Sequence, residues 1–185
     1  QAQVPVLAGY NEGEIRSLRI LLPPPPASAE AYEAEIRARY GERANAFLDI
    51  YPATDIDASM LAATRDALYG WSAERLAAGQ QAIGQGGWLY YFDHGYPMAD
   101  ALGLRAFHAS EIPYVFGTLD KTPAYWPRVP DGGTETGLSR SMSGYWASFI
   151  KTGRPAAPGE PVWPAYGPAR NYLALETGPV ARSDP

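Results

Sequence analysis

The sequence contains no cysteine, so disulfide bonds, thiolate zinc sites and a cysteine nucleophile are excluded. This absence does not decide the compartment, because proteins of the cytoplasm and of the periplasm can both lack cysteine. Histidine is almost as scarce: His94 and His108 are the only two, and they lack the four-residue spacing of a helical metal-binding pair. We therefore expect neither a metal site nor a cofactor.

Long apolar runs and dense basic stretches are also missing. No segment approaches the roughly 20 apolar residues that a membrane-spanning helix needs. The net charge is −5 and no cluster of Lys and Arg could track a phosphate backbone, which argues against nucleic-acid binding. The start, QAQVPVLAGY, has neither a Met nor the charged segment of a signal peptide. We expect a soluble chain, cytoplasmic, periplasmic or secreted, that begins inside a longer protein.

The composition that remains is that of a globular protein, with 46% hydrophobic, 12% aromatic and 19% charged residues. Short apolar runs predict buried strands at residues 4–10, 88–94 and 171–176. Three helical patterns lie between them, at residues 29–40 and 58–83 in the first stretch and at residues 137–152 in the second. Strands that alternate with helices in this way predict an α/β fold.

Capping residues and glycines set the expected boundaries. Ser28 is placed to cap the first helix and Gly41 to end it, and the second helix is expected to be interrupted near Gly70. The GQGG at residues 84–87 follows a helix and precedes a strand, the reverse of a phosphate-binding loop, so it predicts a helix end. The PPPP at residues 23–26 predicts a stiff spacer, with a polyproline ligand as the alternative.

Acidic residues and one histidine carry the candidate chemistry. Acyl transfer needs a nucleophile, a neutral imidazole that takes its proton, and a carboxylate that orients the imidazole. Glu14 follows the first strand and precedes His108, which is the order of acid and base in α/β-hydrolases, but no serine in the required context precedes them. A pair of carboxylates for glycoside hydrolysis is the alternative, and the sequence does not choose among the candidates Glu12, Glu14, Asp93 and Glu111.

Three motifs make the chain recognisable. GYNEGE matches a G-x-N-x-x-E turn, and HASEIPYVFG matches the segment H-x-x-E-I-x-Y-V-F-G. SGYWASFIKTGRP followed by VWPAY matches a late helix and a W-P end motif, and LYYFDH falls where an aromatic strand is expected. With these motifs in order along nearly the whole chain, the sequence resembles the C-terminal part of the type-B carboxylesterase and cholinesterase family.

The resemblance implies a fold and roles for single residues. Residues 1–185 would form the C-terminal portion of a single α/β-hydrolase catalytic domain, with a mostly parallel sheet flanked by helices. Glu14 takes the place of the triad acid and His108 that of the general base. Glu111 is expected to be a buried, hydrogen-bonded carboxylate that supports the histidine loop, with a plain surface glutamate as the alternative. His94 is expected to be structural.

The chain departs from the family in what it lacks. There is no G-x-S-x-G, and GWSAE, which contains Ser72, has no second glycine and lies in a helical pattern. The glycine-rich oxyanion-hole loop is missing as well, so we expect a fragment whose partner is the N-terminal half that carries the serine. Ser17 and Leu18 stand where cholinesterases have aromatic residues, which puts a choline site in doubt.

The function that follows is a serine carboxylesterase acting on an ester substrate, with a catalytically silent, cholinesterase-like interaction module as the alternative. Arg16 and Phe107, beside the acid and the base, are expected to lie near the substrate. Arg16 and Arg19 could contact an anionic substrate group, with solvated surface arginines as the other interpretation. Without its other half the chain is expected to be inactive and to self-associate.

Overall fold

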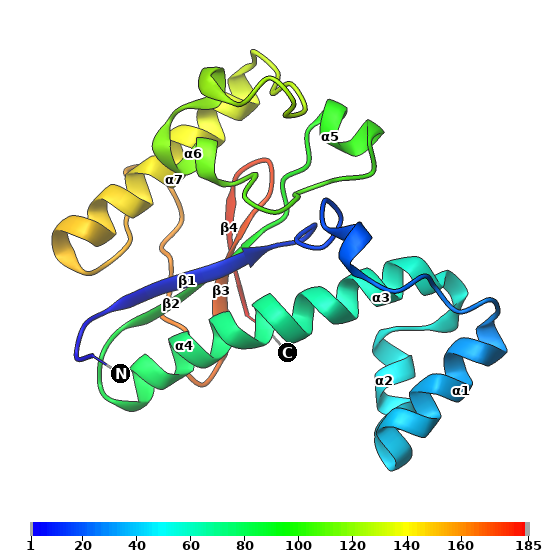
Figure 1. Cartoon of the computed structure of the whole chain (residues 1–185). Coiled ribbons are helices and arrows are strands. Elements are labelled where there is room, and N and C mark those ends of the chain that lie inside the picture. The colour runs from blue at the N-terminus through cyan, green and yellow to red at the C-terminus, as the bar shows by residue number, and fades with distance from the viewer. Residues whose placement is uncertain (1, 184–185) are drawn as a thin grey trace.

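The sheet of the computed structural model, which describes residues 2–183, has four strands. They are β1 (Val6–Asn11), β2 (Gly87–Phe92), β3 (Asn171–Leu175) and β4 (Pro179–Ser183), and they lie side by side in that order. β1, β2 and β3 are parallel, and β4 returns antiparallel to β3 (Figure 1). The mostly parallel α/β sheet predicted from the sequence is therefore confirmed, and β4 is an addition to it.

Helices cover both faces of this sheet. On one face, α4 (Trp71–Ala82) packs through Ala73 and Ala77 against Leu89 of β2. On the other face, α6 (Ile112–Phe116) and the long α7 (Gly133–Thr152) cover the strands (Figure 1). Side chains along β2 alternate between these two faces. Trp88 and Phe92 pack on the face covered by α6 and α7, and Leu89 packs on the face covered by α4.

The GQGG segment ends α4, as its sequence context predicts. Gly84 has a φ of 77° and lies just beyond the helix. Gly87, already in β2, has a different role, because a Cβ there would lie 2.2 Å from the carbonyl oxygen of Ala77 in α4. The glycine thus lets a helix backbone and a strand backbone approach each other closely.

A helical arm stands apart from the sheet. It contains α1 (Ala29–Tyr40) and α2 (Ala44–Ile50), joined by the 3-10 turn Gly41–Arg43 (Figure 1). Ser28 caps α1 by accepting a hydrogen bond from the Ala31 backbone at 3.2 Å, and Gly41 has a φ of 55°, so both predicted caps are confirmed. α2 was not predicted, because its seven residues have no side-chain cap to mark their start.

The predicted helix at 58–83 is an α-helix interrupted by a π turn. α3 (Ile56–Arg65) leads into the π-helical segment Asp66–Gly70, and α4 follows without a break in the chain direction. The interruption expected near Gly70 is confirmed. It is a π-helical turn, in which the hydrogen bonds span one residue more than in an α-helix. The remaining short elements are α5 (Pro97–Ala101) and the 3-10 turns Arg19–Leu21, Ala53–Asp55 and Leu119–Lys121.

The strand predicted at 4–10 begins later than expected. Pro5 has no N–H to donate to a ladder, and the paired residues start at Val6. None of the helices within residues 2–183 combines the length and the apolar character needed to cross a bilayer.

Candidate active site

The candidate site lies where β1 ends. The turn that follows Asn11 contains Glu14 and is here named the acid turn. The loop between α5 and α6 contains His108 and is named the histidine loop. Backbone contacts hold the two segments together: the Gly13 N–H donates to the Ala106 carbonyl at 2.8 Å, and Gly13 and Phe107 form a parallel β-bridge. Residues that are 94 apart in the sequence are thereby brought side by side at the carboxyl end of the strands, where α/β sheets usually bind ligands.

Glu14 and His108 are directly hydrogen-bonded. The distance between Oε2 of Glu14 and Nδ1 of His108 is 2.5 Å, and the other carboxylate oxygen accepts the Asn11 backbone N–H at 2.9 Å. The Glu14 side chain is 7% exposed, whereas that of His108 is 46% exposed. A carboxylate on Nδ1 favours the imidazole tautomer that carries its proton there, which leaves Nε2 free to accept a proton. The predicted hydrogen bond between Glu14 and His108 is present, and their roles as acid and base stay a prediction.

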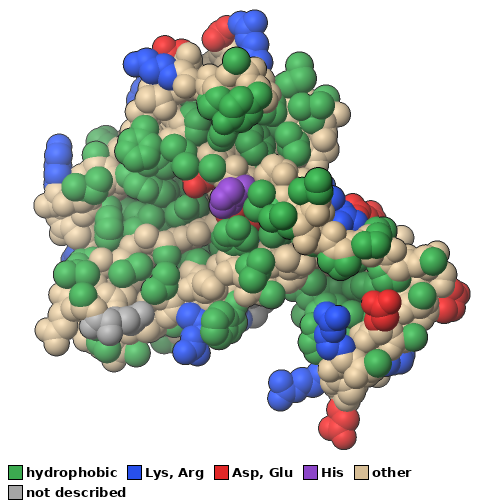
Figure 2. All heavy atoms as spheres, in the orientation of Figure 1, with side chains coloured by type: hydrophobic (Ala, Val, Ile, Leu, Met, Phe, Trp, Pro, Cys, Tyr) green, Lys and Arg blue, Asp and Glu red, His purple; other side chains and the backbone are tan. Residues whose placement is uncertain are grey.

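The surroundings of His108 combine acidic and aromatic groups. Figure 2 shows histidine atoms near the middle of the face drawn, with acidic atoms beside them and hydrophobic side chains nearby. The ring of Tyr69 lies 5.6 Å from that of His108, between centroids, and burial together with the Glu14 carboxylate raises the pKa of Tyr69. Tyr69 belongs to the π turn, and its place beside the histidine could not be predicted, because helical periodicity does not show where a π turn rotates its side chains.

Glu111 is a mostly buried carboxylate that accepts a hydrogen bond, as the resemblance implies. Its Oε2 accepts from the side-chain amide of Asn11 at 2.6 Å. Burial raises the pKa of Glu111, the Asn11 hydrogen bond opposes that rise, and the charge of Glu14 adds to it. Its support of the histidine loop stays a prediction.

The two arginines after the acid are occupied by other groups. Arg16 lies 3.5 Å from the Glu12 carboxylate and donates to the Gly103 carbonyl at 3.3 Å. Arg19 pairs with Asp57 at 2.7 Å. Each guanidinium thus binds a group of the protein itself, and the suggestion that either contacts a substrate anion stays a prediction.

Phe107 precedes the base, and its side chain is 5% exposed. It packs in a cluster of aromatic residues, with its ring centroid 4.9 Å from that of Trp126 and 6.5 Å from that of Tyr96. Its predicted place beside the substrate is not tested by this packing.

Glu12 and Glu14 serve different partners although only one residue separates them. Glu12 is surrounded by cations: Arg105 lies at 3.0 Å, Arg16 at 3.5 Å and Arg65 at 3.9 Å. This network ties the acid turn to the end of α3, where Arg65 also bonds Asp66 at 2.7 Å. Glu12 therefore anchors the turn, and Glu14 alone faces the histidine.

The other histidine is buried and hydrogen-bonded, which fits the structural role expected of it. His94 is 4% exposed and its Nε2 lies 2.8 Å from the carboxylate of Glu135, which also accepts the Tyr114 hydroxyl at 2.5 Å. This buried group joins the end of β2 to α6 and α7.

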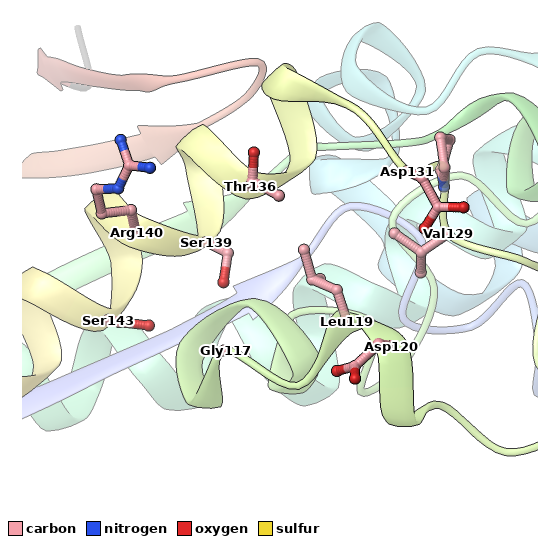
Figure 3. Close-up of a pocket in the computed structure, with 10 residues that line it drawn as sticks. Gly117, Leu119, Asp120, Val129, Asp131, Thr136, Ser139, Arg140 and Ser143 are labelled. Atoms are coloured by element: carbon pink, nitrogen blue, oxygen red, sulfur yellow. The ribbon is translucent and has the colours of Figure 1, made fainter.

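A surface pocket of about 430 Å³ lies between α7 and the segment that follows α6 (Figure 3). The hydroxyls of Ser139 and Ser143 donate to the Tyr114 carbonyl, and Arg140 is also part of the lining. Its lining includes no residue of the acid turn or of the histidine loop. Among residues 2–183, no group of three His, Asp or Glu side chains is arranged to hold a metal ion.

The sheet, its two helical layers and an acid–histidine pair at the carboxyl ends of the strands define the α/β-hydrolase fold. The family model described as "Carboxylesterase family" matches residues 2–184, and the chain belongs to that family. Among solved structures, a PNB esterase superposes with a TM-score of 0.72 at 26% identity, over 98% of this chain and 36% of that one.

Curated relatives have the same kind of name. The chain is 39% identical to the acylcarnitine hydrolase of Rattus norvegicus over 78 residues, which are 42% of this chain and 13% of that protein. It is 30% identical to the fumonisin B1 esterase of Sphingopyxis macrogoltabida over 171 residues, 89% of this chain and 31% of that protein. The chain thus spans less than a third of these curated relatives.

Proposed function

We propose that this chain supplies the acid and the base of a Ser-Glu-His triad in a serine carboxylesterase, and that the serine and the oxyanion hole lie in an N-terminal half of the same protein. The observation that carries the proposal is the hydrogen bond of 2.5 Å between Glu14 and Nδ1 of His108. The acid is buried and the base is half exposed, which is the arrangement that a proton-transferring imidazole needs.

In the first half of the reaction His108 acts as a base and then as an acid. Its Nε2 takes the proton of the serine hydroxyl while the serine oxygen bonds to the ester carbonyl carbon. The imidazolium that forms lies against the buried Glu14 carboxylate, which stabilises its charge. The C–O bond to the alcohol then breaks, and His108 returns the proton to the departing alkoxide.

The second half releases the acid. His108, neutral again, takes a proton from water, and the resulting hydroxide attacks the acyl-serine. When the bond to the serine oxygen breaks, the proton passes from His108 to that oxygen, so the carboxylic acid leaves and the enzyme is regenerated. Glu14 keeps its charge throughout and holds the imidazole in place.

The substrate class is a carboxylic ester. The relatives are named for different substrates, an acylcarnitine in one and fumonisin B1 in the other, so their names support the class and not a particular ester. The acid–base pair also favours an enzyme over a silent interaction module, because a binding surface has no physical need of a buried carboxylate oriented on an imidazole.

The test uses the full-length protein that contains this chain, with p-nitrophenyl acetate as substrate. His108→Ala should lower kcat by a factor on the order of a thousand, because it removes the base. Glu14→Gln keeps the shape and removes the charge, and it should lower kcat by about a hundredfold.

Glu12→Gln is the matched control, since it changes the neighbouring carboxylate, whose partners are arginines. It should lower Tm, because it removes the charge that these arginines surround, and leave kcat within about threefold. Equal losses of kcat at positions 12 and 14 would contradict the assignment of the acid, and full turnover in His108→Ala would contradict the proposal itself.

A further inference from the structure

We infer that Asn11 is a positioning residue, which fixes the His108 loop against the Glu14 turn through its side-chain amide. The inference rests on the function proposed above and adds a residue to it. Asn11 is the last residue of β1 and is 1% exposed. It therefore lies at the boundary between the rigid sheet and the turn that carries the acid.

Both protons of the Asn11 amide are used on the histidine loop. Nδ2 donates to the Phe107 carbonyl at 2.9 Å and to Oε2 of Glu111 at 2.6 Å. Phe107 precedes His108 directly, and Glu111 follows it by three residues, so one NH2 group holds the loop on both sides of the base. The Asn11 backbone N–H meanwhile donates to Oε1 of Glu14. Asn11 is therefore hydrogen-bonded both to Glu14 and to the loop that carries His108.

The chemistry of the site requires an amide here. The Asn11 side chain has two partners, the backbone carbonyl of Phe107 and the carboxylate of Glu111, and both are acceptors. A neutral group with two donors satisfies them without adding charge. The Asn11 oxygen has no hydrogen-bond partner among the described residues, which means that the NH2 group alone makes the connection. An aspartate would place a second carboxylate against Glu111, and an apolar residue would leave Glu111 and the Phe107 carbonyl without this donor.

The loop needs such support because its backbone is held in an uncommon conformation on either side of the base. Arg105 has a φ of 51° and Ala109 a φ of 69°, both in the left-handed region that non-glycine residues avoid. The Phe107 carbonyl accepts the Ser110 backbone N–H at 2.9 Å in addition to the Asn11 amide. These bonds converge between the two strained residues, and His108 lies at that point.

The experiment compares Asn11→Leu with Gln80→Met in the full-length protein. Gln80 is also 1% exposed, also uses only its NH2 group, and donates to the Ala2 and Val4 carbonyls at the far end of β1. Both changes replace a buried amide by an apolar side chain of similar size, so both should lower Tm. Asn11→Leu alone should lower kcat, by a factor on the order of ten or more, with KM nearly unchanged.

Two further measurements separate positioning from folding. In proton NMR of the resting protein, the far-downfield signal of a His108 Nδ1 proton shared with Glu14 should be present in the wild type and in Gln80→Met, and lost or shifted in Asn11→Leu. In a rescue pair, Asn11→Asp should lower kcat further than Asn11→Leu. Adding Glu111→Gln to it should recover kcat at least in part. In the double variant the amide at position 111 donates to the carboxylate at position 11, so the hydrogen bond is kept with donor and acceptor exchanged.

The outcomes distinguish the two proposals. If His108→Ala abolishes turnover while Asn11→Leu and Gln80→Met keep equal kcat, the role of Asn11 is wrong and the esterase proposal stands. If the wild type shows no His108-dependent turnover, the esterase proposal fails, and the NMR comparison alone decides whether Asn11 positions the histidine. If Asn11→Leu does not fold, the rescue pair decides: no recovery of kcat on adding Glu111→Gln overturns the inference.

Discussion

Two carboxyl groups of the site, the buried Glu14 and the partly buried Glu111, accept hydrogen bonds from different groups. Glu14 accepts bonds on both oxygens, from the Asn11 backbone and from His108. Glu111 accepts a hydrogen bond from the Asn11 side-chain amide, and burial raises the pKa of Glu111. Because its pKa is raised by burial, Glu111 is a group whose ionisation works against folding.

We predict that Glu111→Gln stabilises the protein more at neutral than at acid pH. The folded protein holds the Glu111 proton more tightly than the unfolded chain does, so its contribution is most favourable at low pH. That contribution is lost as pH rises from the ordinary value of about 4.3 through the raised one. Glutamine has no such loss and still offers an oxygen to Asn11. The Tm difference, variant minus wild type, should be more positive at about pH 7.5 than at about pH 4.

Glu35→Gln on the exposed face of α1 serves as the control for this comparison. Its Tm difference should change little between the two pH values. A Tm difference for Glu111→Gln that is constant, or that becomes more negative with rising pH, would mean that Glu111 is stabilised as an anion in the fold.

At the scale of elements, the site depends on the contact between the acid turn and the histidine loop. Gly13 lies at that contact, and a Cβ on it would be 2.5 Å from the Leu104 carbonyl oxygen and 2.8 Å from that of Ala106. The second glycine of GYNEGE, Gly13, is thus needed for the close approach of two backbones, which are also joined by the Gly13–Ala106 hydrogen bond.

Gly13→Ala should accordingly lower both stability and activity. The new methyl group meets backbone atoms that cannot rotate away, so we expect a cost of about 1–3 kcal/mol and a separation of Glu14 from His108 that reduces kcat at least tenfold, as an order of magnitude. Thermal unfolding and p-nitrophenyl acetate turnover of the full-length variant measure the two effects.

Gly137→Ala provides the contrast, because Gly137 lies inside α7 and an added Cβ would have no atom within 4 Å. It should raise stability by about 0.5–1 kcal/mol and leave kcat unchanged. If both alanines had the same small effect, the packing of the turn against the loop would be less tight than the distances indicate.

The π turn is the second element that shapes the site. It joins α3 to α4 and places two consecutive side chains in different surroundings: Tyr69 lies beside His108, and Leu68 is 59% exposed. Asp66 in the same turn bonds Arg65 and the Tyr51 hydroxyl. The turn therefore connects the helical arm, the acid turn and the base.

At the scale of the molecule, the sheet ends on β1. In the described part of the chain β1 pairs only with β2, so the main-chain groups on its other side are without a strand partner. The site lies at the end of this same strand. A serine on a segment that pairs along β1 could reach it, which is how we expect the N-terminal half to complete the triad.

The purified 185-residue chain alone should therefore hydrolyse no ester and should self-associate. The sequence has no G-x-S-x-G elbow, and the unpaired edge and apolar surface favour aggregation. Light scattering after gel filtration and turnover of p-nitrophenyl acetate measure the two expectations. Adding the N-terminal half should restore solubility and turnover, and His108→Ala should abolish the turnover while the assembly still forms.

Steady ester hydrolysis by the isolated chain that disappears in His108→Ala would contradict this expectation. It would show that a nucleophile is present within these residues and that the triad does not need a second segment.

The sequence by itself determined the alternation of strands and helices, the caps Ser28 and Gly41, and the pairing of Glu14 with His108, whose roles as acid and base stay a prediction. These follow from local periodicity, from capping chemistry and from short motifs, all of which depend on neighbours in the chain. Family resemblance added Glu111 as a carboxylate that accepts a hydrogen bond, and the structure shows it partly buried.

Only the tertiary structure decided the remaining features. Asn11 and Gly13 meet the histidine loop across more than ninety residues of chain, and Tyr69 reaches His108 because a π turn rotates it there. β4, with four exposed positions, has too weak an apolar pattern to be recognised without its partner β3. Such contacts depend on strand order, register and the path of loops, and these are set by the packing of distant segments, which no local pattern encodes.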